Sequence, residues 1–377
     1  MDLFKVYPLL DVELESGKGV FVFDKNGQKY LDFYGGHAVI SVGHAHPYYI
    51  KALNEQLEKL VFYSNSVHLD IQQKLAEKLG QISGYTNYNL FLINSGAEAN
   101  ENALKLASFY NKRKKVIAFS GAFHGRTAAA VAVTDNPKIK PAINPDDHVI
   151  FLPFNDNVAL KKTFKEQGHE ICAVIVEPIQ GVNGIYEASA SFLEKIQELC
   201  HQNDAIFIAD EVQCGFARSG RFFAHQFANV QPDIITTAKG MGNGFPVGGV
   251  LINEKIQAVY GMLGTTFGGS PLACAATLAV LEIIENEHLI ENTQQMGQYL
   301  LDNLKNIKGL KQIRGKGLIL GLEFEAPIKD LRNDLLFKHH IFTGNSNNAN
   351  TLRVLPSLTI QKEEIDLFLN ALQKETN

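Results

Sequence analysis

The chain has 377 residues, 45% of them hydrophobic and 20% charged, so it can bury a large core and is predicted to divide into two domains. Its net charge is −5, and the densest basic cluster is the short run 112–115, which argues against nucleic-acid binding. The sequence has no apolar window as long as a membrane-spanning helix and no basic region followed by an apolar stretch at its N-terminus. We therefore expect no membrane association and a cytoplasmic location.

The first predicted element is a β-hairpin within residues 20–31. Asn26 and Gly27 stand between two apolar runs, and an Asn-Gly pair in that position is a strong signal for a tight turn between antiparallel strands.

From residue 89 onward, short apolar runs alternate with amphipathic segments. Apolar runs separated by enough chain for a helix predict a mainly parallel sheet covered by helices on both faces. The runs are Leu90–Ile93, Val116–Phe119, Val149–Leu152, Ala173–Val176, Ile206–Ala209, Ile234–Thr237 and Gly249–Ile252. The predicted fold class is therefore α/β, with this sheet at the centre of a large domain.

The last third of the chain has a different pattern. Helical periodicity over 273–284 and 290–304 is followed by the strand-like segments 317–324 and 352–355, which are typical of a smaller α+β domain. The predicted division is an N-terminal segment at 1–58 that packs with the small domain, a large domain at 59–262 and the small domain at 263–377.

The sequence gives little support for a metal site. The four cysteines are scattered without a Cys-x-x-Cys pair, so we expect reduced, mostly buried thiols rather than a zinc site or disulfides. His44 and His46 lack a nearby acidic or Cys ligand, and we expect them to have a structural role near the domain junction. The run GMGNG at 240–244 lacks both nucleotide-binding fingerprints.

Lys239 is the most informative residue of the chain. It lies between the apolar run 234–238 and an uncharged, glycine-rich stretch. Apolar surroundings favour the neutral, nucleophilic amine, which suits Schiff-base chemistry. The alternative is an ordinary solvated surface lysine.

Asp210 ends another buried strand, just before Glu211. An acid at the carboxyl edge of a parallel sheet lies where open α/β folds bind ligands, and it can hold a heterocyclic nitrogen protonated. Pyridoxal phosphate needs both this acid and a lysine. The alternative is a turn or cap residue.

Two further motifs follow strands. Ser95, Gly96 and Ala97 open a predicted helix over 99–110, where backbone N–H groups and the helix dipole can bind a phosphate, although Ser95 could equally be a plain cap. Phe123 could stack on a planar cofactor and Arg126 could bind a carboxylate; the alternatives are a core residue and a surface ion pair.

These motifs together resemble those of the class III (ω-amino-acid) pyridoxal phosphate aminotransferases. The matching segments are NSGAEAN, FHGRT, AVIVEPIQG, DEVQCGFARSG, TTAKGMGNGFPVGG, GTTFGGSPLACAA and LRVLPSL, in order, and they span nearly the whole chain with the N-terminal GKGVFVFDKNGQKYLDFYGGHAVISVGHAHP. Within the family, the likeness is greatest to the acetylornithine and succinylornithine aminotransferases.

The resemblance implies a fold-type I pyridoxal phosphate-dependent transferase that works as a homodimer with shared active sites. Lys239 would form the Schiff base and shuttle the proton, Asp210 would pair with the pyridine nitrogen, Gln213 would touch the ring hydroxyl and Phe123 would stack on the ring. The phosphate would be held by Ser95, Gly96 and Ala97, joined by Thr266 of the partner subunit.

The resemblance also implies two substrate-binding arginines. Arg353 would bind the α-carboxylate of glutamate or 2-oxoglutarate, and Arg126 would bind the distal carboxylate of both substrates. The family usually has a glutamate after EPIQG that pairs with the first of these arginines, but this chain has Val182 there. Arg353 is therefore expected to lack its charged shield.

The predicted reaction is transfer of the δ-amino group of N-acetylornithine to 2-oxoglutarate, in arginine biosynthesis. Alternatives are succinylornithine, ornithine or 4-aminobutyrate as the donor, a lyase or aminomutase of the same fold, and a pyridoxal phosphate-binding regulator. Retention of Lys239, Asp210 and both arginines argues against a purely regulatory role, because cofactor binding alone needs no second carboxylate clamp.

Overall fold

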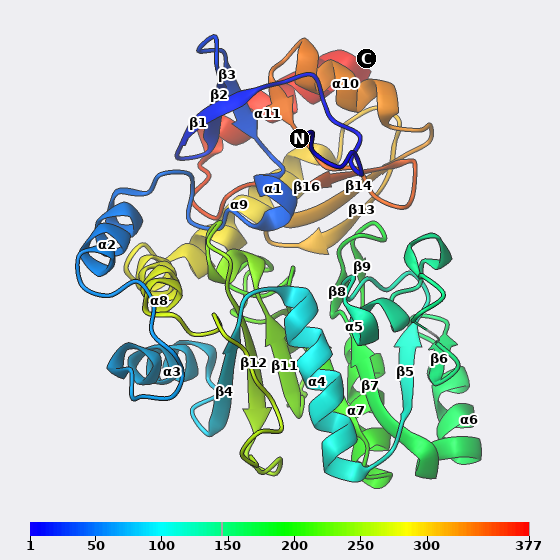
Figure 1. The fold of residues 1–377 in the computed structure, drawn as a ribbon. Coiled ribbons are helices and arrows are strands. Elements are labelled where there is room, and N and C mark those ends of the chain that lie inside the picture. The colour runs from blue at the N-terminus through cyan, green and yellow to red at the C-terminus, as the bar shows by residue number, and fades with distance from the viewer. Residues whose placement is uncertain (145, 377) are drawn as a thin grey trace.

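The structure is a computed structural model that describes residues 1–144 and 146–376. Its central sheet has the strand order β4 (Tyr88–Ile93), β12 (Gly248–Asn253), β11 (Ile234–Thr237), β10 (Ile206–Asp210), β7 (Ile171–Val176), β5 (Lys115–Phe119) and β6 (Val149–Leu152) (Figure 1). Strand β12 is antiparallel to both neighbours, and the other strand pairs are parallel. The predicted, mainly parallel sheet is confirmed, and every predicted apolar run lies in one of its strands.

Both faces of this sheet are covered, as alternate residues of one strand show. In β7, Ala173 and Ile175 pack in the apolar cluster that contains helix α4 (Gly96–Asn111), whereas Val174 and Val176 pack in the cluster that contains α6 (Asn157–Gln167) and α7 (Ala190–Gln202). Neighbouring side chains of a strand point to opposite faces, so α4 lies on one face and α6 and α7 lie on the other. These strands are apolar throughout because both faces are buried.

Helix α4 begins three residues earlier than the sequence predicted. Ser95 has an extended backbone and its hydroxyl accepts a hydrogen bond from the Glu98 backbone N–H at 3.3 Å, which is the geometry of an N-cap. The cap leads directly from β4 into the helix. Gly96 is therefore in the first turn, at the carboxyl edge of the sheet.

The predicted N-terminal hairpin is confirmed. Strands β2 (Phe21–Asp24) and β3 (Lys29–Asp32) pair antiparallel across the turn that contains Gly27, whose φ of 79° suits a residue without a Cβ. Strand β1 (Leu14–Lys18) pairs with β2, and the short β15 (Ile341–Phe342) pairs with β3. The N-terminal strands consequently lie beside the C-terminal helices at the top of Figure 1.

The C-terminal part contains a second antiparallel sheet, β13 (Leu310–Lys316), β14 (Ile319–Phe324) and β16 (Thr351–Val354). The strand predicted over 317–324 begins at Ile319, because Gly317 has a φ of 56° and lies in the turn after β13. The predicted helices are confirmed as α8 (Pro271–Asn286) and α9 (Leu289–Leu304). The domain boundaries at residues 58 and 262 stay a prediction.

The remaining helices and strands are short or peripheral. They are α1 (Gly35–Ala38), α2 (Pro47–Leu57), α3 (Asp70–Ser83), α5 (Ala128–Ala132), α10 (Lys329–Phe337), α11 (Lys362–Thr376), β8 (Ile179–Gln180), β9 (Tyr186–Glu187) and the 3-10 turns Pro137–Ile139, Gly168–Glu170, Ala224–Phe227 and Lys239–Met241. Among the described residues, none of the helices has both the length and the apolar character needed to cross a bilayer.

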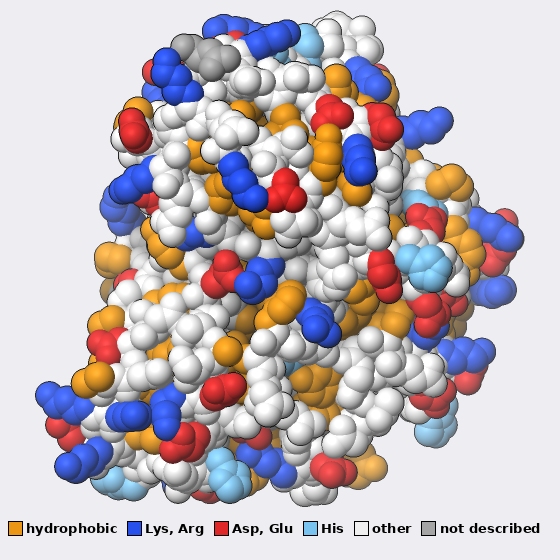
Figure 2. All heavy atoms as spheres, turned by 180° about the vertical axis from the view of Figure 1, so that it is seen from behind, with side chains coloured by type: hydrophobic (Ala, Val, Ile, Leu, Met, Phe, Trp, Pro, Cys, Tyr) orange, Lys and Arg blue, Asp and Glu red, His pale blue; other side chains and the backbone are white. Residues whose placement is uncertain are grey.

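The four cysteines are free and buried, as predicted. The two histidines considered for a metal site instead contact carboxylates: His44 Nε2 lies 2.9 Å from Asp32 Oδ2, and His46 Nε2 lies 2.9 Å from Glu287 Oε1. Figure 2 shows acidic and basic side chains interspersed over the face behind that of Figure 1. This mixing agrees with the near balance of 35 basic and 40 acidic residues.

Candidate active site

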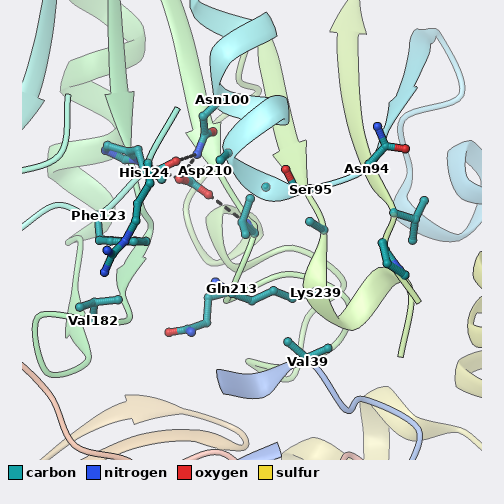
Figure 3. Close-up of a pocket in the computed structure, with 18 of the residues that line it drawn as sticks. Val39, Asn94, Ser95, Asn100, Phe123, His124, Val182, Asp210, Gln213 and Lys239 are labelled. Carbon is teal, nitrogen blue, oxygen red and sulfur yellow. Dashed lines mark hydrogen bonds and ion pairs between the residues drawn. The ribbon is translucent and has the colours of Figure 1, made fainter. Parts of the chain in front are cut away.

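A cavity of about 410 Å³ lies where β10, β11 and the start of α4 meet (Figure 3). It brings together most of the predicted site residues. Those that line it are Ser95, Gly96, Ala97, Phe123, Arg126, Val182, Asp210, Gln213 and Lys239. Ligands of open α/β folds bind at this edge of the sheet.

Lys239 lies two residues after β11 and opens a 3-10 turn. Its φ of 47° is unusual for a residue with a side chain, and such local strain is found most often at functional sites. Burial lowers the pKa of the ammonium, while Asp210 and Glu177 partly oppose that shift. The site therefore favours a neutral, nucleophilic amine more than water does.

Asp210 is buried at the end of β10, and donors converge on its carboxylate. Its Oδ2 lies 2.7 Å from His124 Nδ1 and accepts a hydrogen bond from Asn100 Nδ2 at 2.7 Å, while Oδ1 accepts the Val212 backbone N–H at 3.0 Å. Asn100 is held in turn by the Thr236 hydroxyl, at 2.7 Å. The carboxylate is thus fixed in orientation before any ligand arrives.

Glu177 is a second buried carboxyl group at the cavity, and the sequence alone gave no sign of it. Burial raises its pKa to about 7, with a further upward contribution from Asp210 that His124 opposes. Its Oε1 accepts the Phe123 backbone N–H and its Oε2 accepts the Gly181 backbone N–H, each at 3.0 Å. Glu177 therefore joins the two loops that form one side of the cavity.

The sequence alone predicts no role for His124, Asn100 or Glu177. Each lies inside a quoted motif, FHGRT, NSGAEAN or AVIVEPIQG, so the motifs were the available signal. The motifs do not show which of their residues contact each other. His124 and Asn100 both contact Asp210, although they are 86 and 110 residues away from it in the sequence.

The start of α4 forms one end of the cavity, where the sequence predicts a phosphate site. The first N–H groups of a helix have no partner inside it, and the dipole is positive there. Gly96 also allows close packing, since a Cβ at this position would lie 2.5 Å from Val212 Cγ1. Ser95 is an N-cap, as the alternative interpretation expected, and its contact with a phosphate stays a prediction.

Phe123 and Gln213 lie on other walls of the cavity (Figure 3). Gln213 Nε2 donates to the His37 carbonyl at 3.1 Å, but its Oε1 is buried and has no hydrogen-bond partner among the described residues. A buried acceptor without a partner is costly unless a ligand supplies the donor.

The two predicted arginines differ in their surroundings. Arg126 is exposed at the cavity and takes part in no ion pair among the described residues. Arg353, on β16, is only 3% exposed and does not line the cavity itself; its Nη1 donates to the Gly181 carbonyl at 3.2 Å. Val182, next to that carbonyl, does line the cavity.

Thr266 is exposed and lies outside this cavity, in the segment before α8. The chain therefore does not bring Thr266 to its own site. Its predicted contact with the cofactor of a partner subunit stays a prediction.

The cavity thus combines a desolvated lysine, a fixed carboxylate, a helix N-terminus and a buried acceptor without a partner. These groups fit a phosphorylated, planar aldehyde with a ring nitrogen and a ring hydroxyl, which is the chemistry of pyridoxal phosphate.

Comparison with known proteins identifies the family of this chain. The Aminotransferase class-III family model matches residues 5–375. The acetylornithine aminotransferase of Methanocaldococcus jannaschii is 40% identical, over 98% of this chain and 94% of the relative. This chain therefore belongs to the class III aminotransferase family, as the motifs indicated.

Solved structures support the fold assignment. The ornithine aminotransferase of Toxoplasma gondii, which has PLP at its active site with partial occupancy, superposes with a TM-score of 0.91 at 29% identity, covering 99% of this chain and 92% of that one. The acetylornithine aminotransferase of Elizabethkingia anophelis has a TM-score of 0.86 at 30% identity, and the match covers 99% of this chain and 95% of that one. The fold is that of the fold-type I enzymes, and the cofactor is pyridoxal 5′-phosphate.

Proposed function

We propose that this chain transfers the δ-amino group of N-acetylornithine to 2-oxoglutarate, a step of arginine biosynthesis. The observation that carries the proposal is that one cavity holds Lys239, Asp210 and the start of α4 together. Among relatives, those named acetylornithine aminotransferase match nearly the full chain at about 40% identity. The cytoplasmic location stays a prediction from the sequence.

When bound, pyridoxal phosphate supplies an electrophilic aldehyde and a ring that accepts electrons. Lys239 would hold that group and would move a proton at the reacting carbon of the substrate. Asp210 would hold the proton on the ring nitrogen, Gln213 Oε1 would accept a hydrogen bond from the ring hydroxyl, and Phe123 would pack on the ring face. The first turn of α4, with Ser95, Gly96 and Ala97, would hold the phosphate.

The two arginines divide the substrate carboxylates between them. N-acetylornithine has its carboxylate far from the reacting amine, whereas glutamate has one carboxylate beside the reacting carbon and another further away. Arg126 binds the distal carboxylate of both, and Arg353 binds the proximal carboxylate of glutamate. A planar guanidinium matches a carboxylate better than an ammonium does.

A homodimer is supported by an exposed apolar surface made of residues 57–67 and 259–267. Phe62 and Phe267 contact each other with ring centroids 5.5 Å apart, and they are 38% and 63% exposed. Further exposed apolar residues in these segments are Leu57, Leu60, Val61, Tyr63, Val67, Val259 and Tyr260. Exposed apolar side chains of this kind are typical of interfaces between chains, and Thr266 is the residue before Phe267.

The first test concerns the amino donor. Glutamate formation from 2-oxoglutarate should be fastest, in kcat/KM, with N-acetylornithine in a panel that also contains N-succinylornithine, ornithine and 4-aminobutyrate. A tenfold preference for another member would assign that donor instead. Failure to form glutamate from any of them would favour the lyase, aminomutase or regulator alternatives.

The second prediction concerns Lys239. Borohydride should bleach the visible absorption of the cofactor-loaded protein and attach the cofactor covalently to Lys239, which peptide mass spectrometry identifies. Lys239→Ala should lose turnover, because no other amine among the cavity-lining residues can take its place. Lys255→Ala, at a lysine paired with Asp233 outside the cavity, is the control. Full turnover by Lys239→Ala would refute the assignment.

The third prediction separates the arginines. Arg126→Ala should slow both half-reactions, while Arg353→Ala should slow mainly the glutamate half. Each variant loses one charge-assisted contact, so the activation free energy of an affected half-reaction should rise by about 1.5–3 kcal/mol. Single-turnover kinetics of each half measure this. Equal damage to both halves by Arg353→Ala would contradict the division.

Val182→Glu extends the same experiment. A carboxylate at this position would offer Arg353 a charged partner and compete with the proximal carboxylate of glutamate. We expect a higher preference for the ω-amine donor, with Val182→Gln as the uncharged control. No change in donor preference would show that Val182 does not set the availability of Arg353.

The fourth prediction concerns the dimer. If Thr266 of the partner subunit helps to hold the phosphate, cofactor binding and association are linked, since a ligand that contacts both chains stabilises their assembly. Removing the cofactor should raise the dimer dissociation constant in analytical ultracentrifugation. A monomer that binds the cofactor with unchanged affinity would exclude the shared site.

A further inference from the structure

Glu177 follows strand β7 and bridges the two loops on one side of the cavity. The residue before it, Val176, is 1% exposed and belongs to the central sheet, so the backbone under Glu177 is held by the core. Its Oε1 accepts the Phe123 backbone N–H and its Oε2 accepts the Gly181 backbone N–H, each at 3.0 Å. Both oxygens of this buried carboxylate are thus used to join backbone to backbone.

The first of these loops, residues 120–127, carries Arg126. Phe123 lies three residues before this arginine, and the far end of the loop is anchored where Thr127 Oγ1 donates to Glu101 Oε2 at 2.7 Å. The Arg126 side chain is exposed at the cavity and forms no ion pair among the described residues. The backbone of the loop therefore determines where its guanidinium can reach.

The second loop, residues 177–183, helps to hold Arg353. The Gly181 carbonyl accepts a hydrogen bond from Arg353 Nη1 at 3.2 Å, and Arg353 Nε donates to the Asn345 carbonyl at 2.5 Å. A displacement of Gly181 would therefore move one of the acceptors that orient this buried guanidinium.

Other contacts keep the second loop close to the first. Gln180 Nε2 donates to the Ser120 carbonyl at 3.0 Å, which is a further bond between the same two loops. Gly181 packs directly against Gln213, since a Cβ at position 181 would lie 1.7 Å from Gln213 Oε1. The bridge through Glu177 is therefore part of a close-packed contact between the loops.

We propose that Glu177 sets the spacing between Arg126 and Arg353 and thereby determines which length of dicarboxylate the site binds. The inference rests on the proposed roles of these two arginines. A ligand with two charged ends benefits from its second contact only when both binding groups lie at the matching distance. Glu177 is a positioning residue in this account, because it acts through the backbone N–H groups of Phe123 and Gly181.

Binding of three unreactive dicarboxylates, succinate, glutarate and adipate, tests this proposal. They have four, five and six carbons, and each is titrated into the cofactor-loaded protein while the shift of the cofactor absorption band is followed. Glutarate, which has the length of glutamate, should bind the native protein most tightly. Glu177→Gln replaces one acceptor oxygen by a donor, so the preference for glutarate should fall about 3- to 10-fold, the scale of one lost hydrogen bond.

Two further variants separate the bridge from the charge. Glu177→Asp keeps the charge and shortens the side chain, so it should lose the preference as well, and either Glu177 variant alone decides the question if the other fails to fold. Loss of the charge by itself would change the affinities of the three dianions alike and leave their ratios unchanged. Glu187→Gln is the matched control, because Glu187 Oε1 accepts the Gly315 backbone N–H at 2.9 Å outside the cavity.

An unchanged preference for glutarate in the Glu177 variants would overturn the proposal. An equal loss of affinity for all three dicarboxylates would overturn it too, because Glu177 would then support the site without setting its length. The proposed function fails differently: equal binding of the three ligands by the native protein, or a native preference retained by Arg353→Ala, would remove the assignment of the two arginines.

Discussion

The parallel pairing of β10 with β11 is the constraint on which the site depends. In this register Asp210 is opposite Thr236, so the acid that ends one strand and the lysine that follows the next reach the same edge of the sheet. Both strands are buried on both faces, and a shift by one residue would turn every side chain to the opposite face. The hydrophobic core therefore fixes the chemistry at its edge.

Around this edge, burial acts differently on the charged groups. It makes the amine of Lys239 easier to deprotonate and the carboxyl of Glu177 easier to protonate. Asp210 is instead surrounded by donors from His124, Asn100 and a backbone N–H, which fix the orientation of its carboxylate. The site thus combines a reactive amine with a rigid acid, and hydrogen bonds rather than exposure set the geometry of that acid.

Much of this could be predicted from the sequence because buried strands have a plain signature. The runs that became β7 and β10 are apolar throughout, and Lys239 and Asp210 follow or end such runs. Strand β13, with the mixed sequence LKQIRGK, gave no such signal. The contacts of His124 and Asn100 with Asp210 join segments distant in sequence, and only the three-dimensional structure brings them together.

The most direct test of the account is the protonation state of the cofactor ring, measured by NMR with pyridoxal phosphate labelled at the pyridine nitrogen with ¹⁵N. In the native protein the ring nitrogen should stay protonated across neutral pH, because the carboxylate of Asp210 is predicted to pair with it. In Asp210→Asn, which keeps the size of the side chain and loses its charge, the nitrogen should lose its proton and turnover should fall by several powers of ten, about 1.4 kcal/mol of barrier for each. An unchanged ¹⁵N shift in that variant, with near-normal turnover, would contradict the account.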